Sequence, residues 1–204
     1  MERDWARSAA IAELGNGLTE AGHHEDALSA KEAELAMLRR IGVTEGRLLI
    51  TQSNIACTYQ MVGRLEDALR LYRDVYSGQV KLKGEEHGDT LLAAKNYAGS
   101  LIGLERFEET KALMLRTIPV ARRTLGESNI LTLSMRSIHA STLYEDRGAT
   151  LDDVREAVET LEETERIARR VLGGASPTIV PIIGALRAAR AKLRDRETPS
   201  PGHS

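Results

Sequence analysis

The sequence is poor in cysteine, in aromatic residues and in charge of one sign, and each shortage excludes a class of protein. Cys57 is the only cysteine among 204 residues, so neither an internal disulfide nor a cysteine-based zinc site can form. Aromatic residues make up 3% of the chain, so the core must consist mainly of Leu, Ala, Ile and Val. The net charge is −2 and there is no long basic run, which argues against a nucleic-acid partner.

Long apolar segments are also absent. The longest apolar run, Ile179–Ile183, is far too short to span a bilayer and is interrupted by Pro181. The first residues, Met1–Trp5, contain no apolar stretch of the kind found in secretory signals. We therefore expect a soluble cytoplasmic protein with no membrane partner.

What the sequence does have is internal repetition. Gly42, Gly84 and Gly126 lie 42 residues apart, and an alanine follows each glycine by 14 residues at Ala56, Ala98 and Ala140. Self-similarity at a fixed period of 20–50 residues indicates a repeat array. Such arrays form solenoids in which each unit packs only on its neighbours, and they commonly hold another chain along a concave face.

Each repeat is predicted to contain two helices, because its apolar residues recur with a helical period. Gly63 separates the two helices of the second repeat, since a left-handed helix end is easiest for glycine. Gly84 ends the second of these helices, and Asp89 or Thr90 is expected to be the N-cap of the next one. The predicted helices span residues 4–20, 25–40, 48–62, 65–82, 91–104, 107–124, a helix beginning at 131, and 152–172.

The repeats predict a single domain over residues 1–195. Its units cover about 4–42, 46–84, 88–126 and 130–173, and a capping helix over 177–195 is expected to cover the apolar face of the last unit. The fourth unit has five extra residues in its turn, yet Gly173 follows Ala157 by 16 residues, as Gly84 follows Ala68. Residues 196–204 are polar and proline-rich and are expected to be disordered.

The pattern resembles a tetratricopeptide repeat with a long period. The residues that carry the resemblance are Asn54-Ile55-Ala56, Gly63-Arg64-Leu65-Glu66-Asp67-Ala68, Tyr72 and His87-Gly88-Asp89-Thr90-Leu91. The usual period of that family is 34 residues, and the period of 42 is similar to that of the kinesin light chain type. The resemblance covers residues 8–190 and implies an all-α, right-handed superhelical solenoid of tetratricopeptide-like helix pairs with a C-terminal capping helix.

The resemblance also implies where a peptide would bind. In this family the first helix of each pair lines the concave groove, and an asparagine there bonds the backbone of the bound peptide. The matching positions are Asn54 and Asn96, whereas Glu13 and Ile138 occupy the equivalent places in the outer units. Other groove candidates in the same frame are Ser53, Cys57, Gln60, Met61, Leu92, Lys95, Gly99, Ile102, Ser134, Ser137 and Ser141.

Catalytic and metal-binding motifs are lacking. The adjacent His23 and His24 point about 100° apart on a helix and do not suit a two-ligand site. Cys57 has no histidine at a motif spacing, and no glycine-rich phosphate loop follows a strand. We therefore expect no enzyme activity, no cofactor and no metal.

The favoured function is a non-catalytic scaffold that binds a peptide or protein segment in the concave groove, with Asn54, Asn96 and Lys95 as the leading contact residues. One alternative is a structural or self-associating module that uses its convex face or its ends. Another is an accessory part of a larger signalling protein. A hydrolase or metal enzyme is a further alternative from another class. It would need a pocket with convergent titratable groups, and the sequence offers none. The partner is a protein or peptide of unknown identity, and a monomer or a weak dimer is compatible with the sequence.

Overall fold

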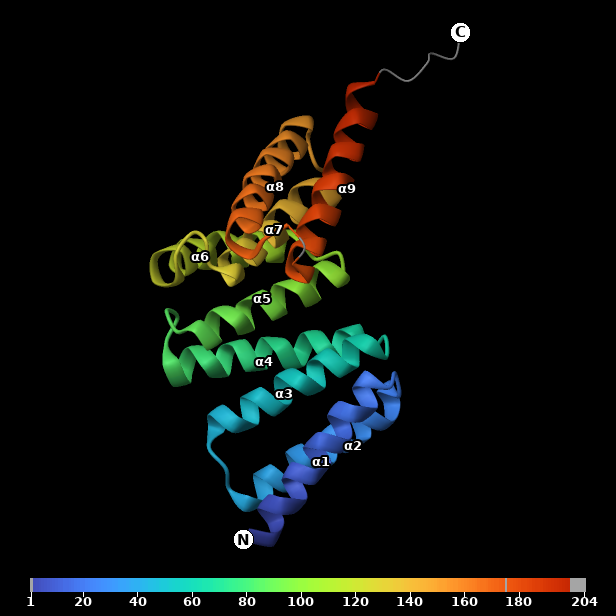
Figure 1. The fold of residues 1–204 in the computed structure, drawn as a ribbon, viewed down its shortest axis with the longest axis vertical. Helices are drawn as coiled ribbons and strands as arrows, with labels where there is room; N and C mark the ends of the chain where they lie inside the picture. Colours follow the sequence, from blue (N-terminus) through green and yellow to red (C-terminus); the bar gives the residue numbers. More distant parts are fainter. Residues whose placement is uncertain (1, 175, 199–204) are drawn as a thin grey trace. The chain divides into compact units, whose positions relative to one another are not determined.

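The computed structural model describes residues 2–174 and 176–198, with only the backbone of Glu2, Arg3 and Thr178 included in that range. These residues form α-helices and one short 3-10 turn, and the described part of the chain contains no strand (Figure 1). The predicted fold class, an all-α repeat solenoid of helix pairs with a capping helix, is confirmed. The chain divides into two compact units, 1–104 and 105–204, each of which is described by itself.

The first unit contains five helices that pack in chain order, each on the next. In Figure 1, α1 and α2 lie side by side, and α3, α4 and α5 follow as successive layers. Their bounds are α1 Glu2–Glu20, α2 His24–Ile41, α3 Glu45–Met61, α4 Leu65–Lys83 and α5 Gly88–Gly103. All five helices were predicted, with ends that differ from the predicted ends by up to three residues.

The second unit contains the remaining helices. They are α6 Phe107–Leu125, α7 Ile130–Glu145, α8 Leu151–Leu172, the 3-10 turn Pro177–Ile179 and α9 Val180–Glu197. Helix α9 packs on both α7 and α8 and buries Ile182, Leu186 and Ala189 against them, as a capping helix should. It also extends two residues into the segment predicted to be disordered, of which residues 199–204 lie outside the described range.

Glycines fix the repeat ends by a backbone requirement. Gly84 (φ 84°, ψ 168°), Gly126 (φ 95°, ψ 158°) and Gly173 (φ 77°, ψ 151°) follow α4, α6 and α8. This combination of angles is open almost only to glycine, because a Cβ would clash with the backbone. The presence of a glycine at each of these three helix ends therefore has a steric cause.

One predicted helix cap is wrong. Helix α5 begins at Gly88, and its N-cap is His87, whose Nδ1 accepts a hydrogen bond from the Asp89 amide at 3.1 Å. Thr90 is instead buried, and its hydroxyl donates to the Gly84 carbonyl at 2.7 Å. The hydroxyl of Thr90, one of the two predicted caps, thus bridges the link between α4 and α5.

The extra residues of the fourth repeat form an ordered turn. Asp146 accepts a hydrogen bond from the Gly148 amide at 2.8 Å, and Lys192 of α9 donates to the Asp146 carbonyl at 3.3 Å. Thr150 and Asp153 then form a reciprocal capping box at the start of α8. The insertion therefore lengthens the turn between α7 and α8, and α8 still begins with a capped N-terminus.

Replacing Gly84 should reveal the backbone strain at a repeat end. We expect Gly84→Ala to lower the free energy of unfolding by about 1–3 kcal/mol, because alanine rarely adopts the required angles. The matched control is Gly99→Ala within α5, where an added Cβ meets nothing within 4 Å. That variant should raise the stability by about 0.5–1 kcal/mol through helix propensity. Urea denaturation measures both, and equal stabilities of the two variants would contradict the assignment.

His139 of α7 should make the second unit sensitive to mild acid. Its Nε2 is buried without a hydrogen-bond partner, and burial lowers its pKa, while Glu156 raises and Lys111 lowers that pKa to smaller extents. When the pH is below about 6.5, His139 binds a proton in the unfolded chain but stays neutral in the folded chain, because its folded pKa is lower. Stability should therefore fall as the pH drops from about 6.5 toward the lowered folded pKa. Melting temperatures at about pH 7.5 and about pH 5 should differ less in His139→Gln than in the native chain, and equal differences would contradict this role.

Candidate functional site

The candidate site is a concave pocket of about 210 Å³ between α3, α4 and α5, all within the first unit. We call it the groove pocket. Helix α4 contributes buried residues between the two walls formed by α3 and α5, and two residues on each wall come from matching repeat positions. Its lining residues are Leu49, Ile50, Ser53 and Asn54 of α3, Val75 and Gln79 of α4, and Asp89, Leu92, Ala93 and Asn96 of α5.

The repeat places the two walls in register. Ile50 and Asn54 lie one helical turn apart on α3, and Leu92 and Asn96 occupy the same two positions on α5. Residues separated by four positions share one face of a helix. Each wall thus presents an apolar side chain followed by an amide, and Ile50 and Leu92 are 51% and 48% exposed. The pocket has an apolar rim with amides beside it.

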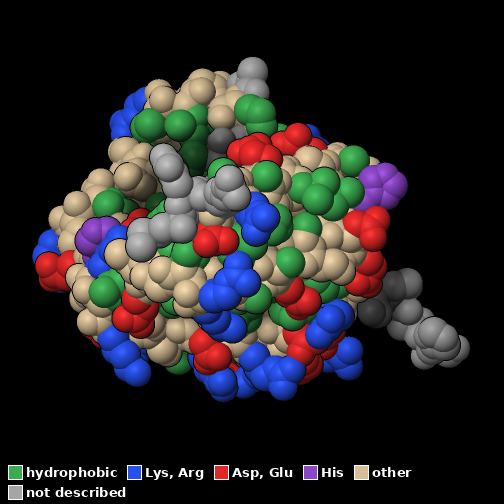
Figure 2. Space-filling view, turned by 90° about the horizontal axis from the view of Figure 1, so that it is seen from below, with side chains coloured by type: hydrophobic (Ala, Val, Ile, Leu, Met, Phe, Trp, Pro, Cys, Tyr) green, Lys and Arg blue, Asp and Glu red, His purple; other side chains and the backbone are tan. Residues whose placement is uncertain are grey.

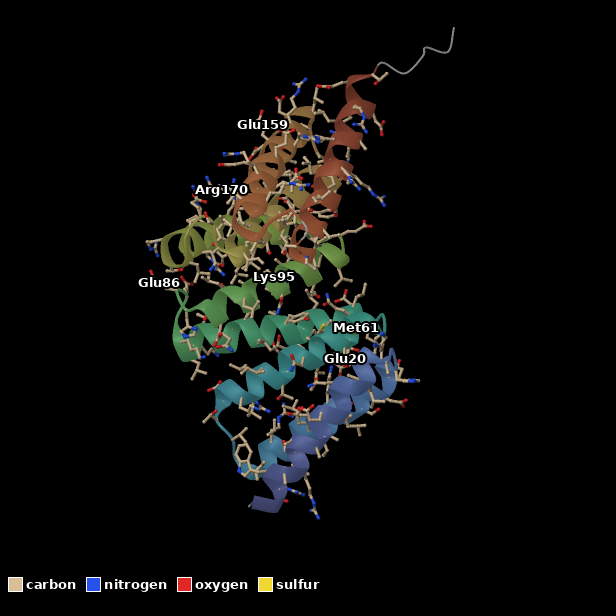
Figure 3. The ribbon with its side chains drawn as sticks, viewed as in Figure 1. Glu20, Met61, Glu86, Lys95, Glu159 and Arg170 are labelled. Atoms are coloured by element: carbon tan, nitrogen blue, oxygen red, sulfur yellow. The ribbon has the colours of Figure 1, made fainter. Side chains whose placement is uncertain are left out.

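The charged side chains near the pocket form hydrogen bonds within the protein. Lys83 donates a hydrogen bond to the Asp89 carboxylate and thereby lowers the pKa of Asp89. Lys95 is half-buried, and its Nζ lies 3.4 Å from Oδ1 of Asn96 (Figure 3). The Lys83–Asp89 ion pair cancels the one formal charge in the pocket lining, whereas Lys95 keeps its positive charge beside the pocket because its partner is a neutral amide.

A buried lysine of α2 is connected to the α3 wall by hydrogen bonds. Lys31 of α2 is 6% exposed, and its Nζ donates to the hydroxyls of Thr19 at 2.8 Å and Thr58 at 3.0 Å. The Thr58 hydroxyl in turn donates to the backbone carbonyl of Asn54 at 3.0 Å. Burial lowers the pKa of Lys31. This chain of hydrogen bonds ties the backbone at Asn54 to the first helix pair.

The pocket brings together four of the predicted site residues. Ser53, Asn54, Leu92 and Asn96 line it, and Lys95 is adjacent to Asn96. Asn54 is exposed, whereas Ser53 and Asn96 are half-buried. These positions come from two different repeats, and the structure places them around one concavity.

The other predicted residues lie elsewhere. Cys57 packs beside the cluster of Ala56, Ala68 and Tyr72, and hydrogen-bonds with the Tyr72 hydroxyl, whose pKa is raised mainly by burial. Gln60 and Met61 lie at the C-terminal end of α3, where Met61 is 47% exposed (Figure 3). The remaining two belong to α7 of the second unit, where Ser137 is buried and Ser141 is half-buried.

Sequence reasoning missed Gln79 and Asp89 as lining residues. Gln79 is 4% exposed on α4, the second helix of its pair, whereas the resemblance points to first helices. A signal was nevertheless present, because the matching positions of the other repeats hold Leu38, Ala121 and Ala168. A polar residue at a repeat position that is apolar in the other units departs from the core pattern. Such departures are expected at functional or strained sites.

A larger concavity of about 450 Å³ lies between α2, α3 and α4, also in the first unit. Leu35, Ile55 and Leu71 form its apolar part, and Tyr59 donates a hydrogen bond to Glu32 at 2.6 Å on its edge. Its charged lining alternates between acids and bases, namely Glu32, Asp67 and Asp74 with Arg39, Arg70 and Arg73. Figure 2 shows a similar interspersion of basic and acidic side chains over the face that it draws.

Neither a membrane-spanning helix nor a metal-binding group was found in the described residues. No helix in residues 2–174 and 176–198 combines the length and the apolar character needed to cross a bilayer. The same part of the chain contains no cluster of three or more histidine, cysteine or acidic side chains able to hold a metal ion.

Comparison with known proteins agrees with this architecture. Residues 48–89, which include α3, α4 and the link to α5, match the family model of the tetratricopeptide repeat. No curated protein matches the sequence significantly.

Solved structures with the same fold include the nearly identical TPR-like repeats of a kinesin light chain-like protein from Podosopora anserina. That structure is 22% identical with a TM-score of 0.73, over 97% of this chain and 91% of the other. A variant of the same protein is 21% identical with a TM-score of 0.75 over the same shares. BtubC (BKLC) from P. vanneervenii is 18% identical with a TM-score of 0.70, over 99% of this chain and 86% of the other. The chain therefore contains a tetratricopeptide repeat at residues 48–89 and has the all-α repeat-solenoid fold of proteins of the kinesin light chain type.

Proposed function

We propose that the chain is a non-catalytic scaffold that binds a peptide or protein segment in the groove pocket of its first unit. Repeat arrays of this fold generally mediate contacts between proteins. The observation that carries the proposal is the pairing of Asn54 and Asn96 on facing walls of one concavity. A side-chain amide both donates and accepts hydrogen bonds, so two of them suit the alternating N–H and C=O groups of an extended backbone.

The apolar rim gives the pocket a second means of binding. Ile50 and Leu92 are about half exposed beside buried Leu49, Val75 and Ala93. Burying such side chains under a ligand contributes about 25 cal/mol for each Å² of apolar surface removed from water. The amides would fix the direction of the bound segment, and the apolar rim would supply most of the affinity.

The chemistry of the lining favours binding over catalysis. Asp89 is the one titratable side chain among the described residues that line the pocket, and it is occupied by Lys83. General acid–base catalysis needs a group placed for proton transfer, and nucleophilic catalysis needs a nucleophile beside a base. The nearly neutral lining also favours a segment of low net charge over a strongly acidic one.

Self-association is a second candidate function, favoured by the larger concavity between α2, α3 and α4. Its acids and bases alternate around an apolar floor of Leu35, Ile55 and Leu71. A surface that carries both signs can be complementary to itself, as a two-fold dimer interface requires. This candidate predicts a mass in solution that rises with protein concentration.

Peptide selection on the full chain tests the groove. A random peptide library displayed on phage supplies a binder, whose affinity is then measured by fluorescence polarisation. We expect Asn54→Ala/Asn96→Ala to weaken binding about fivefold to hundredfold, because two hydrogen bonds worth about 0.5–1.5 kcal/mol each are lost. The double variant should stay folded, since alanine is a better helix former than asparagine.

The matched control is Gln52→Ala, which removes an amide from α3 on the side of the larger concavity. Its affinity for the same peptide should equal that of the native chain. Unchanged binding by the double variant, or equal loss in the control, would contradict the groove assignment. Sedimentation analysis across a range of concentrations distinguishes the self-associating alternative.

A further inference from the structure

Gly78 lies in the interior of α4 and departs from the repeat pattern. The repeat frame matches it to Met37, Val120 and Ile167, so the other units carry a large apolar side chain at this position. Glycine is among the least favourable residues in a helix interior, because it loses the most backbone freedom on folding. The second repeat therefore loses helix stability at this position, and the loss needs an explanation.

The side chain of Leu49 on α3 occupies the space that a side chain at position 78 would need. A Cβ added to Gly78 would lie 2.7 Å from Cδ2 and 3.2 Å from Cδ1 of Leu49. Carbon atoms that are not bonded to each other pack at about 3.5–4.0 Å, so Leu49 would have to move. The end of Leu49 thus lies directly against the backbone of α4.

The helix-pair fold does not itself require this arrangement. In the fourth repeat the matching residues are Leu133 of α7 and Ile167 of α8, which are both buried and belong to one core cluster. That helix pair therefore holds a leucine and an isoleucine where the second repeat has a leucine and a glycine. Departures from a fold-forming pattern are expected at functional or strained sites.

Leu49 connects Gly78 to the groove pocket. Leu49 lines the pocket together with Val75 and Gln79, the residues three positions before and one position after Gly78 on α4. It is 5% exposed, so packed protein surrounds most of its side chain. Protein interiors contain few voids, and the open space that borders Leu49 is the pocket. A side chain at position 78 would accordingly push the methyl groups of Leu49 into the pocket.

We propose that Gly78 is a positioning residue that sets the depth of the groove pocket by letting Leu49 lie against the backbone of α4. This inference rests on the proposed function of the groove, and it names a residue outside the lining on which binding depends. Gly78 does not line the pocket, so it acts only through Leu49. An alanine here should fill part of the pocket while every lining residue keeps its identity.

The test compares Gly78→Ala with the native chain. The atoms that must shift form the flexible end of Leu49, and alanine is the better helix former, so the variant should fold. Its affinity for the phage-selected peptide should fall about fivefold to hundredfold, the range that an extra methylene in an occupied space produces. Fluorescence polarisation measures the affinity, and circular dichroism verifies that the variant is folded.

A second substitution separates positioning from a merely structural role. Valine lacks the two Cδ atoms that meet the added Cβ, so Leu49→Val should remove the collision. The affinity of Gly78→Ala/Leu49→Val should therefore lie within about twofold of that of Leu49→Val alone. The matched control is Gly17→Ala in α1, where an added Cβ meets nothing within 4 Å and the peptide affinity should not change.

The position of Leu49 can also be measured without a peptide. Leu49 and Leu92 lie on opposite walls of the pocket. In the full chain with methyl-labelled leucine, the nuclear Overhauser effect between their methyl groups should strengthen in Gly78→Ala. An unchanged effect would show that Leu49 stays in place and would overturn the role of Gly78.

The outcomes separate this inference from the proposed function. For a peptide whose binding depends on Asn54 and Asn96, unchanged affinity in Gly78→Ala would overturn the role of Gly78 and leave the scaffold function intact. The same holds if Leu49→Val fails to suppress the loss. If peptide binding does not depend on the two asparagines, the proposed function fails. The methyl measurement then decides by itself whether Gly78 sets the depth of the pocket.

Discussion

The close approach of the two helices in each pair is the constraint on which the other features depend. In the second repeat, Ala56 and Ala68 are both 0% exposed and pack in one cluster with Tyr72. In the fourth repeat, Ala140 and Ala157 have the same burial and also share a cluster. Helices pack about 8–10 Å apart according to the side chains at their contact. Small side chains here bring α3 close to α4, and this closeness places buried residues of α4 in the lining of the groove pocket.

The sequence was informative about helices because their determinants are local and repeated. The positions of Gly84 and Gly126 mark the helix ends, and the alanine spacing predicts which faces meet. The resemblance to the tetratricopeptide repeat pointed to Asn54 and Asn96, and the fixed period explains why both residues line one pocket. Local pattern and fold agree at these residues, as they do in most of a stable protein.

Other features of the site depend on contacts that no local pattern contains. Cys57 shares the groove helix with Asn54, yet its thiol bonds with Tyr72 of α4 and lies beside the helix-pair core. His87 is the N-cap of α5, and the Thr90 hydroxyl donates a hydrogen bond to the Gly84 carbonyl, six residues earlier. The buried Oε1 of Gln79 has no hydrogen-bond partner among the described residues, which emerges only when the partners of every neighbour are known. For Cys57 and Thr90 the decisive interaction joins separate helices or the two ends of a link.

The glycines that end the second and third repeats have a consequence for how the array can change length. Gly84 and Gly126 have nearly the same backbone angles, with φ of 84° and 95° and ψ of 168° and 158°. A segment of one period that is cut out after one glycine and joined after the other would meet the same local geometry. These links are therefore natural points for duplication, deletion or exchange of whole repeats. A gene encoding this chain could gain or lose binding surface one repeat at a time without redesign of the junctions.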